Sequence, residues 1–302
     1  MRKTAFLLLV ASLLSQSVFP HGNNKHFQNT QEVTVKTTKV AGNVYMLQGS
    51  GGNIGALVGS DGILIVDDDY RTVSEKLAAA LKELGSANPK YVLNTHWHGD
   101  HTQGNEHFGK SSAIIAHANV RKRLSEAQTN TLFNRTTPAS PVHAWPVITY
   151  TESLSLYLNG EEVRAVHYPN GHTDGDTVVF FMGSNVVHLG DDFFVARFPF
   201  VDVDSGGSVQ GLINNIGSLI GKIPSDAKLI PGHGPVATIE DLKAYHAMLI
   251  ETAKIVTDAM KKGQTRDEIK KAGLPEKYKE MGTGFIKTDS WIDIIYWSYS
   301  KK

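Results

Sequence analysis

The chain has 302 residues, with 30 basic and 30 acidic side chains and no cysteine. Hydrophobic residues make up 41% and charged residues 20%, which is ordinary for a globular protein and excludes a disordered, fibrous or multi-span membrane chain. The balanced charge supplies no field that would gather polyanions, so we expect no nucleic-acid partner. The lack of cysteine excludes disulfides and thiol catalysis, and it leaves any metal to His, Asp and Glu.

The N-terminal residues have the pattern of a signal peptide. Arg2 and Lys3 precede an apolar stretch from residue 5 to residue 14. This stretch is too short to cross a bilayer as a helix, which takes about 20 residues. We therefore expect a signal peptide over 1–20, a polar linker over 21–32, no membrane anchor after cleavage, and a periplasmic or secreted protein.

The first half of the mature chain predicts a meander of strands followed by strand–helix units. Short β-branched and aromatic runs between Gly-containing turns are typical of strands. Val73, Leu77 and Leu81 share one helical face, and Gly85 is a natural helix stop. In chain order we expect strands at 33–40, 44–48, 54–58 and 63–66, a helix at 72–84, strands at 91–93 and 113–116, and a helix at 119–127.

The second half predicts another sheet and a helical end. The stretch 129–147 contains three prolines and shows no regular period. After it we expect strands at 163–167, 177–182 and 186–189, a helix at 210–219, a strand at 228–230, and a helix at 239–261. Two groups of strands, each followed by helices, indicate an α+β fold with two αβ layers packed face to face. The expected domain covers 33–262, with a helical extension over 263–302 packed on it.

A histidine-rich run follows the strand predicted at 91–93. Strand alternation would point His96 and His98 to one side, while Gly99 lets the backbone turn so that Asp100 and His101 reach a second point. Neutral imidazole is the commonest biological metal ligand, and zinc accepts both imidazole nitrogen and carboxylate oxygen. The spacing therefore indicates a zinc site, and it suits two ions better than one.

A catalytic zinc takes three protein ligands and keeps one open position, so further ligands must come from elsewhere in the chain. Three residues stand out because each lies at a strand end flanked by glycine. His172 follows Gly171, Asp191 follows Gly190, and His233 lies between two glycines. We predict that these side chains complete the site.

The sequence resembles the metallo-β-lactamase superfamily, whose ordered motifs are matched from about Val44 to His233. The resemblance implies an αββα sandwich of two mixed sheets with helices outside. It implies two Zn²⁺ ions per chain and a buttressing, non-ligating role for Asp67. The implied ligands are His96, His98 and His172 for one ion, Asp100, His101 and His233 for the other, and Asp191 between them.

This resemblance implies a hydrolase. Water shared by two zinc ions loses a proton near neutral pH, and the resulting hydroxide attacks a small ester, thioester, lactone or cyclic amide. Asp100 is the predicted catalytic residue, which orients the hydroxide. The expected partner is a small-molecule substrate.

Two alternatives stay open. A β-lactamase proper is disfavoured because one β-lactamase subclass has Cys, and another Ser, where this chain has Asp191. A related branch holds a single iron and oxidises persulfides, and His96, His98 or Asp191 would serve there too. Metal analysis separates one iron from two zincs.

Three weaker features complete the prediction. The glycine-rich turn 49–53 is either a flap over the site or an ordinary hairpin tip. The aromatic run Phe193, Phe194, Phe198 and Phe200 is divided between core packing and an apolar pocket wall. Of the other histidines only His188 is close enough to Asp191 to suggest a supporting contact.

Overall fold

The computed structural model describes Met1 and residues 33–300, so the predicted signal peptide (apart from Met1) and linker lie outside the described residues. From Val33 onward the chain belongs to one compact unit. The strands are β1 (Lys36–Ala41), β2 (Val44–Gln48), β3 (Ile54–Leu57), β4 (Leu64–Val66), β5 (Tyr91–Leu93), β6 (Ala113–His117), β7 (Gln128–Asn130), β8 (Arg135–Thr137), β9 (Ile148–Tyr150), β10 (Ser153–Leu158), β11 (Glu161–His167), β12 (Thr177–Phe181), β13 (Val186–His188) and β14 (Lys228–Ile230).

The α-helices are α1 (Ser74–Glu83), α2 (Gly99–Thr102), α3 (Asn105–Phe108), α4 (Ala118–Leu124), α5 (Val209–Ile220), α6 (Ile239–Lys261), α7 (Arg266–Ala272) and α8 (Thr288–Ser300). Several begin where the sequence supplies a cap. Thr238 and Asp241 form a reciprocal capping box at the start of α6, and Thr265 and Glu268 form another at α7. Among the described residues no helix is long and apolar enough to cross a membrane.

Two mixed sheets form the centre of the fold. The first has the order β1-β2-β3-β4-β5-β6-β9 and the second the order β10-β11-β12-β13-β14, while β7 and β8 form a separate hairpin. In the first sheet β1 to β4 are antiparallel and β4, β5, β6 and β9 are parallel. The carboxyl ends of β4 and β5 therefore lie at the same edge of the sheet, where the histidine-rich run begins.

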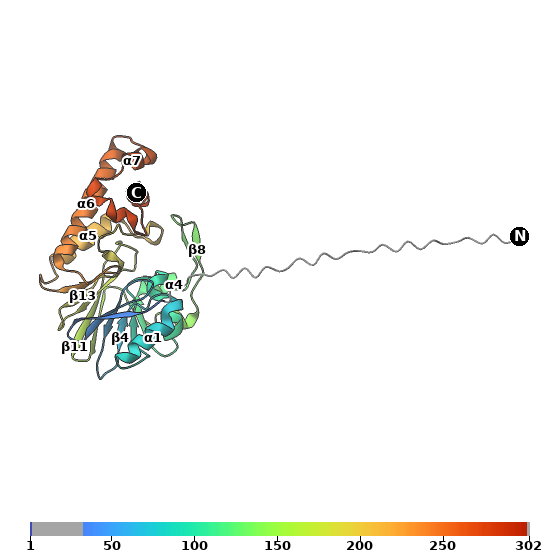
Figure 1. Cartoon of the computed structure of the whole chain (residues 1–302), viewed down its shortest axis with the longest axis vertical. Helices are drawn as coiled ribbons and strands as arrows, with labels where there is room; N and C mark the ends of the chain where they lie inside the picture. Colours follow the sequence, from blue (N-terminus) through green and yellow to red (C-terminus); the bar gives the residue numbers. More distant parts are fainter. Residues whose placement is uncertain (2–32, 301–302) are drawn as a thin grey trace. The chain divides into compact units, whose positions relative to one another are not determined.

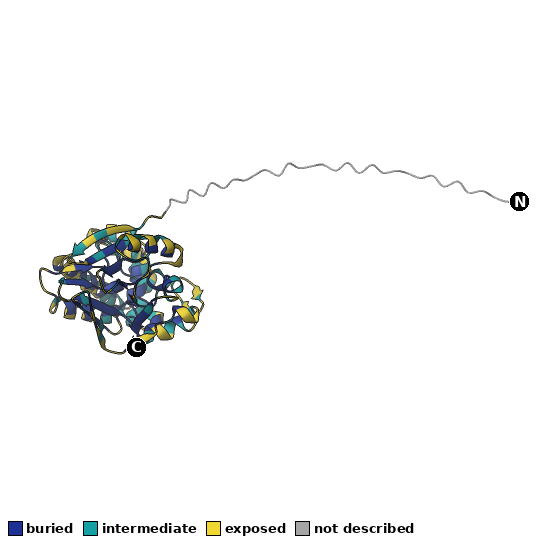
Figure 2. Ribbon diagram, turned by 90° about the horizontal axis from the view of Figure 1, so that it is seen from below, coloured by how far each residue is buried: buried dark blue, intermediate teal, exposed yellow. Residues whose placement is uncertain are grey.

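The core is layered, with helices on the outer face of each sheet (Figure 1). Between the sheets, apolar side chains of alternate strand positions interdigitate, for example Val44, Leu64 and Leu93 of the first sheet with Val163 and Phe181 of the second. The outer face of the first sheet packs on α1, and that of the second packs on α5, α6 and α8. Figure 2 shows the buried strands inside and the exposed residues on the peripheral helices. The predicted α+β sandwich is confirmed.

The element predictions were wrong mainly in the middle of the chain. The stretch 129–147, expected to be irregular, contains most of the β7–β8 hairpin, and β9 and β10 were not predicted. The hairpin strands are only three residues long and polar, so they carry no apolar alternation. The strand expected from 33 begins at Lys36, and the helix expected over 119–127 ends at Leu124, four residues before the hairpin begins at Gln128.

Candidate metal centre

The seven predicted metal ligands meet where loops leave the strand ends of both sheets. His96 and His98 follow β5, whereas Asp100 and His101 lie in the short helix α2, which His98 precedes with extended backbone. His172 comes from the β11–β12 loop, Asp191 follows β13, and His233 follows β14. The structure thus brings together residues up to 137 positions apart in the sequence.

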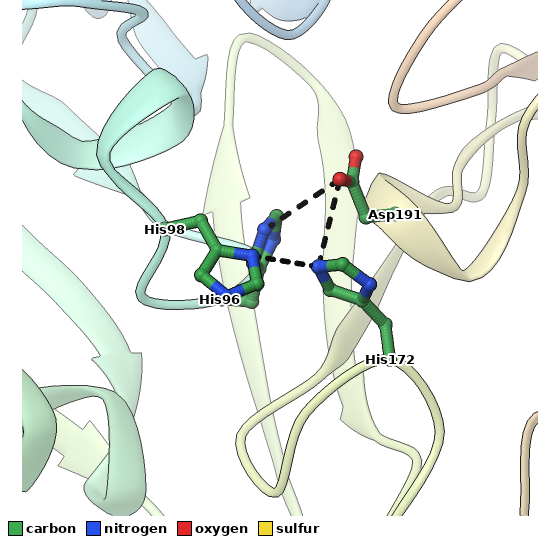
Figure 3. Close-up of side chains that lie close together, drawn as sticks. All are labelled: His96, His98, His172 and Asp191. Atoms are coloured by element: carbon green, nitrogen blue, oxygen red, sulfur yellow. Dashed lines mark hydrogen bonds and ion pairs between the residues drawn. The ribbon is translucent and has the colours of Figure 1, made fainter. Parts of the chain in front are cut away.

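The first ligand group consists of His96, His98, His172 and Asp191, whose nitrogen and oxygen atoms lie within 4.8 Å of one another (Figure 3). His98 Nδ1 lies 2.8 Å from His172 Nε2. Asp191 Oδ2 lies 3.5 Å from His172 Nε2 and 3.8 Å from His96 Nε2. The four side chains therefore point at one small volume.

Hydrogen bonds outside this group determine which imidazole nitrogen faces inward. His172 Nδ1 donates to the carbonyl of Phe200 at 2.6 Å, and His98 Nε2 donates to Asp202 Oδ2 at 2.9 Å. A neutral imidazole carries one N–H, so His98 Nδ1 and His172 Nε2 present lone pairs to each other. Two lone pairs facing at this separation repel unless a cation lies between them.

His96 adds a third inward lone pair. Its Nδ1 donates to Thr95 Oγ1 at 2.9 Å, because that hydroxyl already donates its own hydrogen to Asp67 Oδ2. His96 Nε2 is buried and forms no hydrogen bond with any described residue. A buried polar atom without a partner is costly, so this nitrogen is most simply explained as a metal ligand.

The second ligand group is Asp100, His101 and His233, also within 4.8 Å of one another. Asp100 Oδ2 lies 3.3 Å from His233 Nε2 and 3.7 Å from His101 Nε2. His101 Nδ1 donates to Asp67 Oδ2 at 2.7 Å, which turns His101 Nε2 toward Asp100 and His233. This arrangement matches the predicted second site.

Asp191 connects the two groups through its two carboxylate oxygens. Its Oδ2 faces His96 and His172, whereas its Oδ1 lies 3.1 Å from His101 Nε2 and 3.4 Å from His233 Nε2. A carboxylate divided in this way has the geometry of a bridging ligand.

Asp67 supports both the loop and the second group without entering the centre. Its Oδ1 accepts from the Thr95 backbone N–H at 2.7 Å, and its Oδ2 accepts from His101 Nδ1. Asp67 is fully buried and adopts a left-handed φ of 64°, which the surrounding hydrogen bonds stabilise. Asp67 thus contacts the Thr95 backbone and His101 but belongs to neither ligand group.

Glycines are required where the backbone passes close to the ligands. A side chain at Gly232 would collide with Asp191 Oδ1, and one at Gly52 would collide with the His101 ring. The Gly52 N–H also donates to the carbonyl of Asp100 at 3.0 Å. This hydrogen bond holds the glycine-rich turn 49–53 against the second ligand group. Ser50 and Gly51 of the turn line the cleft over the centre.

The two groups differ in electrostatics. Burial, together with neighbouring imidazoles, lowers the pKa of His96 well below its usual value, and burial lowers the pKa of His172 to about 4. Burial opposes the charged form of His233, but Asp191 and Asp100 outweigh it and raise its pKa to about 9. The same carboxylates raise the pKa of buried His101. Burial thus favours the neutral forms of His96 and His172, whereas the carboxylates of Asp100 and Asp191 favour the protonated forms of His101 and His233.

The donor set fits a pair of zinc ions. It supplies only imidazole nitrogens and carboxylate oxygens, which Zn²⁺ accepts. The inward lone pairs of His96, His98 and His172, fixed by outer hydrogen bonds, are what a metal ligand shell requires. The residues present therefore fit the metal centre that the sequence predicts.

A cleft of about 560 Å³ opens over the centre. His98, Asp100, Asp191 and His233 form part of its wall. Asp100 and His233 are therefore more accessible than His96 and His101, which are buried. The predicted aromatic run is divided: Phe193 packs in the core, whereas Phe194, Phe198 and Phe200 also line the cleft. A cleft of this size accommodates a small molecule.

Several residues of the site were not found from the sequence. Thr95 links Asp67 to His96, and Asp202 holds His98 from a position 104 residues away. The adjacency of Thr95 to His96 was the only sequence signal, and Asp202 had none. His188 contacts the backbone rather than Asp191: its Nε2 donates to the carbonyl of Asn53 and its Nδ1 accepts from the Gly190 N–H.

The sequence pattern of the metallo-beta-lactamase superfamily matches residues 37–233. This stretch contains every predicted ligand and more than half of the chain. The chain therefore belongs to the metallo-beta-lactamase superfamily. A search of curated proteins finds no match.

Solved structures of the same fold include enzymes of different specificity. A double mutant of the sec-alkyl sulfatase PisA1, an enzyme from Pseudomonas sp., superposes with a TM-score of 0.67 at 15% identity and covers 88% of this chain. This chain spans 50% of that sulfatase's length. A metallo-beta-lactamase from Pontibacter korlensis gives 0.60 at 15% identity, with 72% of this chain and 99% of that one covered. The DIM-1 metallo-beta-lactamase gives 0.58 at 18% identity, with 72% and 98% covered. At these identities the likeness shows the fold alone.

Proposed function

We propose that the protein is a dinuclear zinc hydrolase that cleaves a small ester, thioester, lactone or cyclic amide. The observation that carries this proposal is the divided carboxylate of Asp191, with one oxygen facing each ligand group. Two ligand groups that share one carboxylate supply a place for each of two ions. Zinc held in such a site lowers the pKa of bound water to about 7 and polarises a carbonyl oxygen.

The residues of the centre would have two roles, metal binding and orientation of the attacking water. His96, His98 and His172 would hold one ion and Asp100, His101 and His233 the other, with Asp191 serving both. Asp100 is buried for the most part yet reaches the cleft, with 23% of its side chain exposed. Burial opposes ionisation of Asp100, but His101 and His233 lower its pKa to about 2, so its carboxylate is charged. A carboxylate in this position would accept a hydrogen bond from the attacking water and orient it.

We also propose a cellular location for the protein from its sequence. The basic residues and short apolar stretch over 1–20 support export by a cleaved signal peptide, hence a periplasmic or secreted protein. A chain without cysteine is suited to an oxidising compartment. We expect a small-molecule substrate and no nucleic-acid partner.

The test is a panel of lactones, thioesters, esters, phosphodiesters and β-lactams, assayed on the zinc-loaded protein. Asp100→Ala should lower kcat by at least about 100-fold, a typical contribution of a positioned acid–base group, with unchanged circular dichroism. His107→Ala, outside the centre, is the control. Activity of Asp100→Ala near that of the unmodified protein would refute the assignment, and one iron per chain would favour the oxygenase alternative.

A further inference from the structure

The cleft over the metal centre contains two arginines, Arg135 and Arg197, that the hydrolytic chemistry does not use. Among residues 33–300, neither guanidinium has an ion-pair or hydrogen-bond partner that would neutralise it. The acidic residues of the cleft wall are Asp100 and Asp191 of the centre and Asp202, which is engaged by His98. The two positive charges are therefore available to something bound in the cleft.

Arg135 is placed by the β7–β8 hairpin, which projects from the sheets (Figure 1). In the hairpin register Arg135 pairs with Asn130, whose side chain donates to Asp202 Oδ1 at 3.2 Å. Arg135, Tyr70 and Asp100 line the same cleft.

Arg197 is placed by the loop that follows Asp191. Phe194 of this loop stacks on the His233 ring with centroids 5.3 Å apart and an interplanar angle of 14°. Ala196 adopts a left-handed φ of 55°, an unfavourable conformation for alanine that the surrounding structure maintains directly before Arg197. Both arginines line the cleft that Asp100 and His233 of the second ligand group also line.

An aromatic strap crosses the cleft beside these charges. It consists of Phe133 at the hairpin tip, Phe200 and Phe285. Phe133 lies 5.1 Å from Phe200 and 5.3 Å from Phe285, between ring centroids. Phe200 in turn lies 5.5 Å from the His98 ring. Phe133 and Phe285 are 42% and 74% exposed, so the hairpin and the C-terminal segment present apolar surface next to the metal centre.

We propose that the substrate is an amphipathic anion. Its oxyanionic group, separate from the bond that is cleaved, is bound by Arg135 and Arg197, and its apolar chain or ring packs on the aromatic strap. A carboxylate, a sulfate and a phosphate share the recognition chemistry, because guanidinium binds each through paired N–H···O bonds. This substrate class rests on the proposed hydrolase function.

Binding is tested without turnover. The full-length protein is titrated with octanoate, octyl sulfate and octyl phosphate, and with neutral octanol, and Trp97 fluorescence in the cleft wall is one readout. We expect the preferred anion to bind about tenfold more tightly than octanol, and Arg135→Gln and Arg197→Gln each to weaken it about tenfold without affecting octanol. Phe133→Ala should weaken octanoate but not acetate. The headgroup that binds most tightly identifies the oxyanion.

Arg164→Gln is the matched control, since Arg164 lies on β11 and does not line this cleft. Zinc content is measured for every variant, so that a weaker affinity is not caused by loss of metal. An anion held by the metal alone would bind all zinc-loaded variants equally. Equal affinity for octanol and all three anions, or unchanged affinities in both cleft variants, would overturn the proposal.

A comparison of a charged and an uncharged ester distinguishes failure of the anion site from failure of the proposed hydrolase function. Mono-4-nitrophenyl adipate carries a carboxylate that 4-nitrophenyl hexanoate lacks. We expect kcat/KM at least about tenfold higher for the charged ester, with the advantage lost when both arginines are replaced. Equal hydrolysis of the two esters by all variants would overturn the anion site and leave the hydrolase standing. If no substrate of the panel is cleaved, the hydrolase fails, and the binding titration alone decides the anion site.

Discussion

Asp202 connects a metal ligand to the substrate cleft, and Asp202→Ala tests whether that connection matters. Asp202 is buried, with 1% of its surface exposed. Its Oδ2 accepts from His98 Nε2 at 2.9 Å, and its Oδ1 accepts from Asn130 Nδ2 and from the Ser205 N–H at 3.3 Å. Removing the carboxylate frees the His98 ring to rotate or to change tautomer, so Nδ1 no longer has to face the centre.

The size of the effect follows from this hydrogen bond. Loss of a carboxylate that orients a ligating imidazole lowers metal affinity or activity by about 10- to 100-fold. That range corresponds to about 1.4 to 2.7 kcal/mol, which matches a hydrogen bond to a charged group. Asp202→Asn keeps an acceptor of lower charge and should lose less than Asp202→Ala.

The assay is zinc binding by competition with a chromophoric chelator, followed by kcat/KM at saturating zinc. Asp204→Ala is the control, because Asp204 Oδ2 accepts from the Thr131 N–H of the same hairpin at 2.7 Å, whereas the hydrogen bond of His98 Nε2 goes to Asp202. Thermal unfolding of each variant shows whether the fold survives. If Asp202→Ala folds and binds zinc as tightly as Asp204→Ala, the positioning role of Asp202 is refuted.

Two further predictions concern packing. Gly232→Ala places a methyl group against Asp191 Oδ1 and the Gly190 backbone. We expect this variant to lose at least one zinc ion per chain, as measured by elemental analysis. Retention of two zinc ions would contradict the close fit at Gly232. Trp291→Ala removes a fully buried ring that stacks on Phe198 and donates to Thr252 Oγ1 at 3.1 Å, and should lower the free energy of unfolding by about 3–5 kcal/mol. A loss below 1 kcal/mol in urea titration would show that the C-terminal segment is not part of the cooperative unit.

The residues of the two candidate ligand groups were predictable because their signals are local. His98, Asp100, His172, Asp191 and His233 each lie next to a glycine, and His96 and His98 share a two-residue spacing that strand geometry converts into proximity. The strands between the sheets were equally predictable, since Leu64 to Val66 is a continuous apolar run and Val186 and Val187 are β-branched. Composition and residue spacing were thus sufficient to predict the strands of the core and to select the residues that form the two ligand groups.

The cleft was not predictable, because its residues are defined by contacts between distant segments. Arg135 and Phe133 lie in a polar hairpin whose strands bury little apolar surface. The role of Asp202 depends on its approach to His98 across two sheets, and nothing in its own neighbourhood marks it. The proposed substrate recognition therefore depends on the part of the molecule that sequence patterns describe least.

The central claim is that Asp191 bridges two zinc ions, and anomalous diffraction at the zinc edge from crystals of the zinc-loaded protein tests it most directly. We predict two peaks, one on each side of the Asp191 carboxylate, each about 2.0–2.2 Å from its ligating nitrogen and oxygen atoms. A single peak, or two peaks with Asp191 bound to only one of them, would contradict the account.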